Sequence, residues 1–302
     1  MKTSVLLIVV LATGLVAAAP ALASWAWLAS EDRIVEADVV VVGKITAVRE
    51  GFEDGNRKFV LGEIQVAEVL KGDKKLKKAD LAWTQPMRND GDIGYSKDQE
   101  GVWILRKHKD KDCYTANYPS DYQKSDQKDR LAAIARSLES LAWGKAVDGL
   151  QLSLAVRVSP TSAHDGDSAT LRLTTDPLKT EMAKVEFVFL VKNTSDKPLR
   201  YCNWLGDPPC SISLTTPTGK PEIDLYPHRD QVKGMKLTAE NFALVGPGQT
   251  RVAYRWTYDL TDAGTYKATG GFAGKQDGKD LGVESVWTNK LESSPLTVEK
   301  AK

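Results

Sequence analysis

Hydrophobic and polar residues alternate along most of this chain, and the alternation predicts strands. In residues 59–70, Ile64 and Val66 fall on one face of an extended chain, while Glu63 and Gln65 fall on the other. This pattern is typical of a half-buried strand. The first half of the chain is therefore predicted to contain five strands, at residues 34–48, 59–70, 79–84, 101–106 and 113–118. Five short strands in succession predict a small barrel.

One amphipathic helix is predicted at residues 126–143, where apolar residues recur at spacings of three and four. These apolar positions are Leu131, Ile134, Ala135, Leu138, Leu141 and Ala142. Ser125 is well placed as the N-cap of this helix, and Gly144 is well placed to end it. Because the helix has a single apolar stripe, it is expected to pack on the barrel and to belong to the first domain.

From residue 150 onward the alternation continues without a second helix. Strands are predicted at residues 150–158, 169–174, 185–192, 211–214, 251–258, 264–270 and 294–299. Turn residues separate these strands, and such a series without helices is typical of a β-sandwich.

Residues 1–23 have the pattern of a secretory signal peptide. An early lysine precedes an apolar run, and small residues around Ala23 form an A-x-A-type cleavage site, so the mature chain is expected to begin at Ser24. A retained membrane anchor is the alternative, because the apolar run is almost long enough to span a bilayer. Pro20 and the small residues favour cleavage. We therefore expect a secreted or periplasmic protein with no stable membrane anchor.

Charge is nearly balanced, with 41 basic and 40 acidic residues. The lysine-rich stretches 71–78 and 106–111 are diluted by aspartate and are interpreted as solvated turns. Because phosphate binding needs a concentrated basic face, nucleic acid is not expected as a partner.

Three segments of the first half, ADVVVVGKITAVRE, IQVAEVLKGD and GVWILR, resemble the bacterial relatives of the netrin-like module. This module is the OB-type barrel also found in tissue inhibitors of metalloproteinases. Those inhibitors chelate the zinc of the protease through an N-terminal cysteine. The expected mature N-terminus of this chain is Ser24, so the resemblance does not imply zinc chelation.

Three segments of the second half are similar to immunoglobulin-like sandwiches of secreted bacterial proteins, including those of the intracellular-proteinase-inhibitor type. They are FVFLVKNTSDKPL, VGPGQTRVAYRW and DAGTYKATG. The expected fold is therefore mainly β: an OB-like five-stranded barrel with one C-terminal helix at residues 24–145, then an immunoglobulin-like β-sandwich at residues 150–302. Fold alone does not specify function.

The sequence lacks the usual constellation of an enzyme site. His108, His164 and His228 lie far apart in polar stretches, without the spacing of a metal site, and are interpreted as surface histidines. Ser168 follows glycine and aspartate, as in the nucleophile turn of some serine proteases. No glycines follow it to build an oxyanion pocket. A hydrolase that uses Ser168 or His164 is a third, weaker hypothesis.

Two further patterns are also interpreted as structural. The acidic stretches 89–92 and 165–167 lack the full set of ligands of a calcium loop. The glycines of residues 269–274 have the wrong spacing for a phosphate loop and predict a flexible hairpin or a bulge. We therefore expect no catalytic residue, no metal site and no cofactor.

Cys202 and Cys210 flank a loop with seven residues between them. In an oxidising compartment, a disulfide bond between them would stabilise the fold by roughly 2.5 kcal/mol. A redox pair is the alternative, but such pairs usually enclose two residues. On the same loop, Trp204 is either a contact for a partner or a cap over the sandwich core. Cys113 is either buried on the fifth strand or exposed and able to pair between chains.

These features predict an exported, non-catalytic protein that binds another protein, with proteases as the first candidate class of partner. The alternative is a structural or assembly role in the cell envelope, in which both domains act as spacers. Deletion of residues 202–210 would separate the two hypotheses, because only binding through Trp204 would be lost.

Overall fold

The computed structural model describes residues 30–55, 57–84, 94–108, 110–158, 173–204, 209–222 and 236–302. The helices are α1 (Ser30–Glu36) and α2 (Lys128–Glu139), and short 3-10 turns are η1 (Pro119–Asp121), η2 (Ser125–Gln127), η6 (Ala239–Asn241) and η7 (Lys279–Leu281). The strands of the first half are β1 (Val39–Asp54), β2 (Arg57–Lys71), β3 (Lys78–Thr84), β4 (Glu100–Lys107), β5 (Tyr114–Thr115) and β6 (Tyr122–Gln123). Those of the second half are β7 (Leu150–Val158), β8 (Leu178–Thr180), β9 (Lys184–Asn193), β10 (Leu199–Cys202), β11 (Cys210–Thr215), β12 (Pro221–Glu222), β13 (Phe242–Val245), β14 (Thr250–Asp259), β15 (Gly264–Ala273), β16 (Lys290–Glu292) and β17 (Leu296–Lys300). The fold is mainly β, as predicted.

The strands of the first domain pair in a ring, in the order β1, β2, β3, β5, β4, and β4 pairs back to β1. The pairing of β3 with β5 is parallel, and each side of β5 pairs through two residues only. The five strands predicted to form a barrel therefore form a ring with one weakly bonded side, which is not a clearly closed barrel; we keep the name barrel for this ring. Its interior is apolar, and the indole of Trp103 donates a 2.9 Å hydrogen bond to the carbonyl of Gly43.

The start of the first predicted strand was wrong. Ile34 and Val35 lie in helix α1, and the strand begins at Val39. β-Branched residues favour strands locally, but both side chains are buried at a junction of several elements, and tertiary packing overrides that preference. The amide of Ala37 still donates to the carbonyl of Arg33 at 3.0 Å, which completes the last turn of the helix.

The one predicted helix is present as α2, but its ends differ from the prediction. Ser125 begins a 3-10 turn rather than capping the helix, and α2 ends at Glu139, before the predicted stop at Gly144. Ser140 ends it, because its amide and its hydroxyl both donate to the carbonyl of Ser137. The apolar stripe packs on β1 and β4, as expected; the residues that form this cluster include Leu131, Ile134, Ala135, Val40, Val102 and Ile104.

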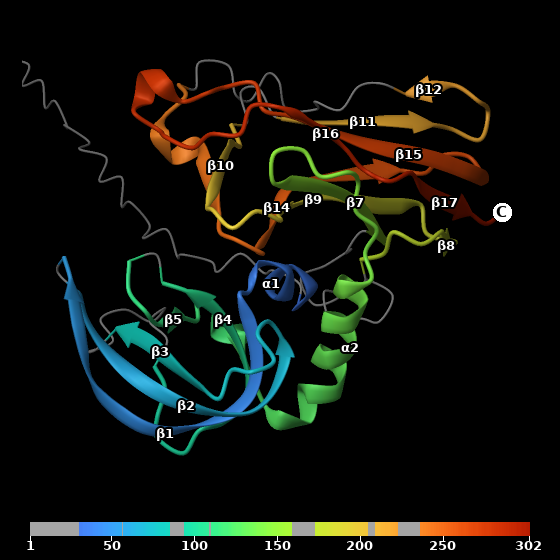
Figure 1. Cartoon of the computed structure of the whole chain (residues 1–302). Helices are drawn as coiled ribbons and strands as arrows, with labels where there is room; N and C mark the ends of the chain where they lie inside the picture. Colours follow the sequence, from blue (N-terminus) through green and yellow to red (C-terminus); the bar gives the residue numbers. More distant parts are fainter. Residues whose placement is uncertain are drawn as a thin grey trace, which may run out of the picture.

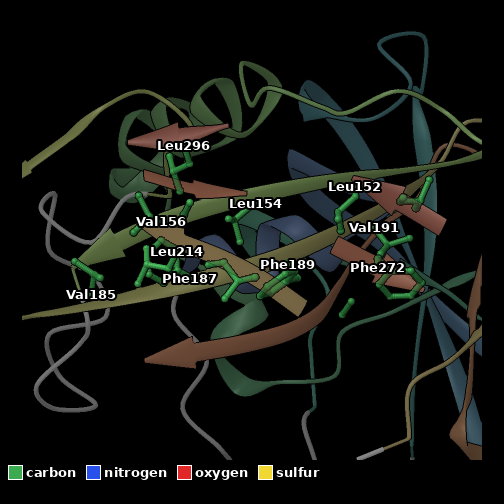
Figure 2. Close-up of a cluster of buried hydrophobic side chains, with 14 of the residues drawn as sticks. Leu152, Leu154, Val156, Val185, Phe187, Phe189, Val191, Leu214, Phe272 and Leu296 are labelled. Atoms are coloured by element: carbon green, nitrogen blue, oxygen red, sulfur yellow. The ribbon is translucent and has the colours of Figure 1, made fainter. Parts of the chain in front are cut away.

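The second domain is a β-sandwich. One sheet has the order β14, β9, β7, and the facing sheet has the order β12, β11, β15, β17, β8, with β16 paired to β15. Strands β10 and β13 form a separate pair. Figure 2 shows the core between the sheets, where Leu154, Phe187, Phe189 and Leu214 meet side chains from β15 and β17. Each fully buried Leu or Phe contributes about 1.5–3 kcal/mol.

The alternation located the long strands of the sandwich and missed the short ones. Most of the predicted strand at residues 169–174 lies outside the described residues, although Thr174 forms a bridge with Val156. The predicted hairpin or bulge at residues 269–274 was wrong, because all but the last of these residues lie within β15. At Gly270 an added Cβ would lie 3.1 Å from the ring of Phe189. This glycine therefore permits close packing between the sheets.

Candidate functional site

Helix α1 lies at the junction of the two domains. In Figure 1 it sits between the barrel below and the sandwich above, with α2 beside it, and it contacts α2, β4 and β14. Residues 30–35 are all at most 3% exposed, and three of them, Glu31, Asp32 and Arg33, carry charged side chains. Buried side chains of this kind need paired partners, and both domains supply them.

The sandwich pairs the two acids of α1. Arg157 on β7 lies 3.3 Å from Glu31, 3.1 Å from Asp32 and 2.6 Å from Glu186 on β9. Arg255 on β14 adds a contact of 3.4 Å to Asp32. We call these five residues the acid–arginine cluster. Burial alone would lower the pKa of Arg157, but the surrounding carboxylates raise it above its ordinary value, so this guanidinium stays charged.

The acid–arginine cluster holds three carboxyl groups against two guanidinium groups. Burial raises the pKa of Glu31 to about 8, although the charge of Arg157 acts in the opposite direction. Glu31 is therefore mainly protonated at neutral pH. A neutral Glu31 leaves two carboxylates facing two arginines, so the charges within the cluster balance.

The raised pKa makes the stability of the fold depend on pH. In the folded state Glu31 holds its proton up to about pH 8, whereas in the unfolded chain it has its ordinary pKa of 4.5. The stabilisation that protonated Glu31 gives to the fold is therefore complete below pH 4.5 and is lost as pH rises through 8. Between pH 5 and 8, we expect the free energy of unfolding to fall by roughly 2–4 kcal/mol more for the wild type than for Glu31→Gln. Urea unfolding at both pH values measures this, with the exposed-site variant Glu292→Gln as control. Equal pH dependence of wild type and Glu31→Gln would contradict the assignment.

The barrel pairs the arginine of α1. Arg33 and Arg106 both face Asp121, which is fully buried; Arg106 lies 2.6 Å from one carboxylate oxygen and Arg33 lies 4.0 Å from the other. Asp121 also accepts hydrogen bonds from the amides of Asn117 and Tyr118 at 2.9 and 3.0 Å. The interpretation of residues 106–111 as a solvated turn was therefore wrong at Arg106, which is 6% exposed.

Lys71, at the end of β2, closes the C-terminal end of α1. Its ammonium donates to the carbonyls of Ile34, Val35 and Ala37 at 2.6, 2.9 and 2.7 Å. Burial lowers the pKa of Lys71 to about 8, so the group is still mainly protonated at neutral pH. The interpretation of residues 71–78 as a solvated turn was wrong at Lys71, because this lysine fills all three donors within the protein.

Two more contacts join the domains next to α1. Arg251 on β14 donates to the carbonyl of Glu36 at 2.8 Å. Asp38 accepts from the backbone amide of Lys107 at 2.6 Å and from the side chain of Gln249. The first domain, α1 and the second domain are thus connected by side chains that come from all three parts.

A second feature lies at the far end of the barrel. The hairpin of β1 and β2 curves away from α2 at the left of Figure 1, and residues 46–54 are exposed except for the half-buried Phe52. The rings of Phe52 and Phe59 are stacked with centroids 4.8 Å apart, and His108 lies edge-on to both. The ammonium of Lys111 lies 5.5 Å from the Phe52 centroid. We call these four residues the hairpin platform.

The sequence patterns did not identify either feature. Helix α1 had one usable signal, the acidic residues Glu31 and Asp32 ahead of an apolar pair, which is typical of a first helical turn. His108 was interpreted as a surface histidine, and it is partly exposed, but its packing against Phe52 and Phe59 depends on segments far apart in the chain. A pattern within a short stretch of sequence cannot predict a contact of this kind.

The loop between Cys202 and Cys210 differs from the expectation of a disulfide bond. Cys202 ends β10 and Cys210 begins β11, and no disulfide bond joins them in the described residues. Burial raises the pKa of the Cys210 thiol far above its usual range, which makes it a poor nucleophile and disfavours a redox pair.

Cys113 is buried, the first of its two expected environments. Trp204 is half-buried, and its indole N–H has no hydrogen-bond partner among the described residues, so its contact role stays a prediction.

Several predicted features lie outside the described residues. They are the signal segment 1–23, the acidic stretches 89–92 and 165–167, and the individual residues Ser24, His164, Ser168 and His228. Within the described ranges, no three His, Cys, Asp or Glu side chains gather as metal ligands. No helix in those ranges is long and apolar enough to cross a bilayer.

Comparison with known proteins identifies no family. No family description and no curated protein matches the chain. Among solved structures, the C-terminal domain of Wzt is similar with a TM-score of 0.30 and 14% identity, over 53% of this chain and 78% of that domain. A CARDB domain from Pyrococcus furiosus, solved as a crystal structure with metal ions, has a TM-score of 0.23 and 9% identity, over 52% and 93%. Its solution structure has a TM-score of 0.21 and 11% identity, over 51% and 100%. Similarities at this level support no statement about function.

Proposed function

We propose that this is an exported, non-catalytic protein that binds another protein, and that the hairpin platform is its contact surface. The observation that carries the proposal is the geometry of the platform. The stacked rings of Phe52 and Phe59 remain partly exposed near the end of a long hairpin, braced by His108 and Lys111. Rigid aromatic side chains give large contact area and lose little conformational entropy on binding.

The outer half of β1 adds backbone groups to this surface. Strand β4 pairs with β1 only through residues 39–44, and Ile45 exchanges backbone hydrogen bonds with Asp98 and Gln99. Beyond Ile45, the described residues give β1 no strand partner other than β2. An open strand edge can accept an extended segment of a partner protein. The side chains of Glu50, Glu53 and Asp54 are exposed along this edge, and such charges disfavour pairing between identical chains.

We expect the partner in the cell envelope or the medium, because the sequence pattern of residues 1–23 predicts an export signal. Proteases are the first class to test, because both resemblances of the sequence point to inhibitor-type domains. The purified chain from Ser24 onward is titrated against metallo-, serine and cysteine proteases, following residual activity and cleavage of the chain. We expect saturable binding of one class without cleavage of this protein.

Matched variants test the surface itself. We expect Phe52→Ala with Phe59→Ala to weaken binding at least about tenfold, because truncation of central aromatic contacts typically costs more than 1 kcal/mol. Leu281→Ala removes an exposed apolar side chain of the second domain and is expected to bind as the wild type. Unchanged binding by the double variant would exclude the platform, and a loss with Trp204→Ala instead would move the contact to the cysteine loop.

The envelope-spacer alternative is compatible with the buried ion pairs through which α1 connects both domains. A rigid two-domain arrangement suits a spacer as well as a binding protein. This alternative predicts that the double variant at Phe52 and Phe59 leaves function in the exporting cell unchanged.

A further inference from the structure

A cavity of about 570 Å³ opens between the two domains beside the C-terminal end of α1. The ends of β1 and β2 line it from the first domain, and β9 with the turn before β14 lines it from the second. Small-molecule sites typically have volumes of roughly 300–1,000 Å³ and occur preferentially at domain interfaces. The cavity contains no residue of the hairpin platform, so it is a separate feature from the proposed protein contact.

One wall of the cavity is apolar. Val35 of α1, Leu138 of α2 and Leu190 of β9 line it together with Leu141 and Trp143 from the segment after α2. These side chains belong to a single hydrophobic cluster that joins both domains. Because this wall offers no hydrogen-bonding side chain except the indole N–H of Trp143, a ligand that covers it needs an apolar body.

Six charged side chains also line the cavity, and three of them already form hydrogen bonds with other groups of the protein. Asp38 accepts hydrogen bonds from a backbone amide and from Gln249. Asp73 accepts from the amide of Lys75 at 2.9 Å. Lys71 uses its three donors on the carbonyls at the end of α1. These three groups therefore hold the cavity walls in place and have little capacity left for a ligand.

The remaining three charged groups are Glu139, Lys107 and Lys192. Glu139 is exposed, and its charge acts on Lys71. Among the described residues, no carboxylate forms an ion pair with Lys107 or Lys192. The ammonium of Lys192 lies 5.6 Å from the ring centroid of Trp143, at the border of the apolar wall. The two lysines come from different domains, so the cavity presents available positive charge on both sides.

We propose that this interdomain cavity binds a small amphipathic anion, with its apolar body on the wall formed by Leu138, Leu190 and Trp143 and its anionic group between Lys107 and Lys192. The ligand class is a hydrophobic carboxylate or a comparable sulfonate. Because the site draws residues from both domains, an occupied cavity stabilises the folded two-domain arrangement in proportion to ligand concentration.

The test uses three probes of equal chain length below their micelle concentrations: decanoate, decanol and decyltrimethylammonium. Calorimetric titration of the purified chain from Ser24 onward is expected to give one decanoate per chain, bound at least about tenfold more tightly than either other probe. Absence of decanoate binding, or equal affinity for decanol, would overturn the proposal.

Variants assign the binding to this cavity. Lys107→Met with Lys192→Met keeps the apolar stems of both lysines, and is expected to weaken decanoate at least about tenfold and to leave decanol unchanged. Lys267→Met, an exposed lysine on β15, is the control and is expected to bind as the wild type. Leu138→Trp is expected to fill the cavity and reduce binding of every probe, with thermal unfolding to verify the fold. Wild-type decanoate affinity in the double lysine variant would place the anion elsewhere.

Discussion

Replacing Arg157 by methionine is expected to lower the free energy of unfolding by about 3–5 kcal/mol. Arg157 contacts all three carboxyl groups of the acid–arginine cluster, those of Glu31, Asp32 and Glu186. Without it, three buried carboxyl groups face one another, and the partly exposed Arg255 is the one guanidinium left in the acid–arginine cluster. The loss corresponds to a fall of roughly 10 °C in Tm for a chain of this size. Thermal and urea unfolding of the two proteins measure it.

A surface ion pair provides the matched control. Lys184 lies 3.6 Å from Asp259, and both side chains are more than half exposed. Lys184→Met is therefore expected to change stability by less than about 0.5–1 kcal/mol. Adding Asp32→Asn to the Arg157 variant should recover part of the loss, because the penalty comes from unpaired charge rather than from missing volume. If Arg157→Met unfolded like the control, the cluster would not hold the junction together.

The second large effect is expected for Asp121→Asn, again about 3–5 kcal/mol. Aspartate and asparagine side chains have nearly the same shape, and the side-chain oxygen of asparagine can still accept hydrogen bonds from the backbone amides of Asn117 and Tyr118. The substitution removes only the negative charge that Arg33 and Arg106 share. The two buried guanidinium groups would then lose the carboxylate that they share. Urea unfolding at neutral pH measures the difference.

The matched control for this charge removal is Asp98→Asn. Asp98 lies 2.8 Å from Lys44, with side chains 66% and 45% exposed, and solvent screens such a pair. We expect less than about 1 kcal/mol for this variant. A result for Asp121→Asn as small as that for Asp98→Asn would mean that water reaches Arg33 and Arg106, and that α1 is not closed off on the barrel side.

Together, the two effects describe how α1 connects the domains. Its acids pair with the sandwich and its arginine pairs with the barrel, so loss of either set weakens contacts to a different domain. If the chain works as a binding protein, this arrangement holds the hairpin platform at a constant orientation relative to the sandwich. It also keeps the walls of the interdomain cavity at a constant separation.

Most long strands were predictable because their information is local. A period-two pattern needs only neighbouring residues, and it located β2, β7, β9 and β14 within one or two residues. Short strands such as β10 and β16 contain too few residues to establish a period. The beginning of β1 was misassigned because Ile34 and Val35 carry a strand preference that their packing at the junction overrides.

The amino-acid sequence by itself determined the mainly β composition, the order of barrel, helix and sandwich, and the amphipathic stripe of α2. All of these follow from side-chain periodicity and turn chemistry within short windows. Only the tertiary structure decided that Arg106 is buried and that the ammonium of Lys71 bonds to the end of α1, although each residue lies in a lysine-rich stretch. It also decided that Phe52 and Phe59 meet His108. The physical reason is that the cost of burying a charge, or the gain from stacking two rings, depends on partners that the chain brings together from distant positions.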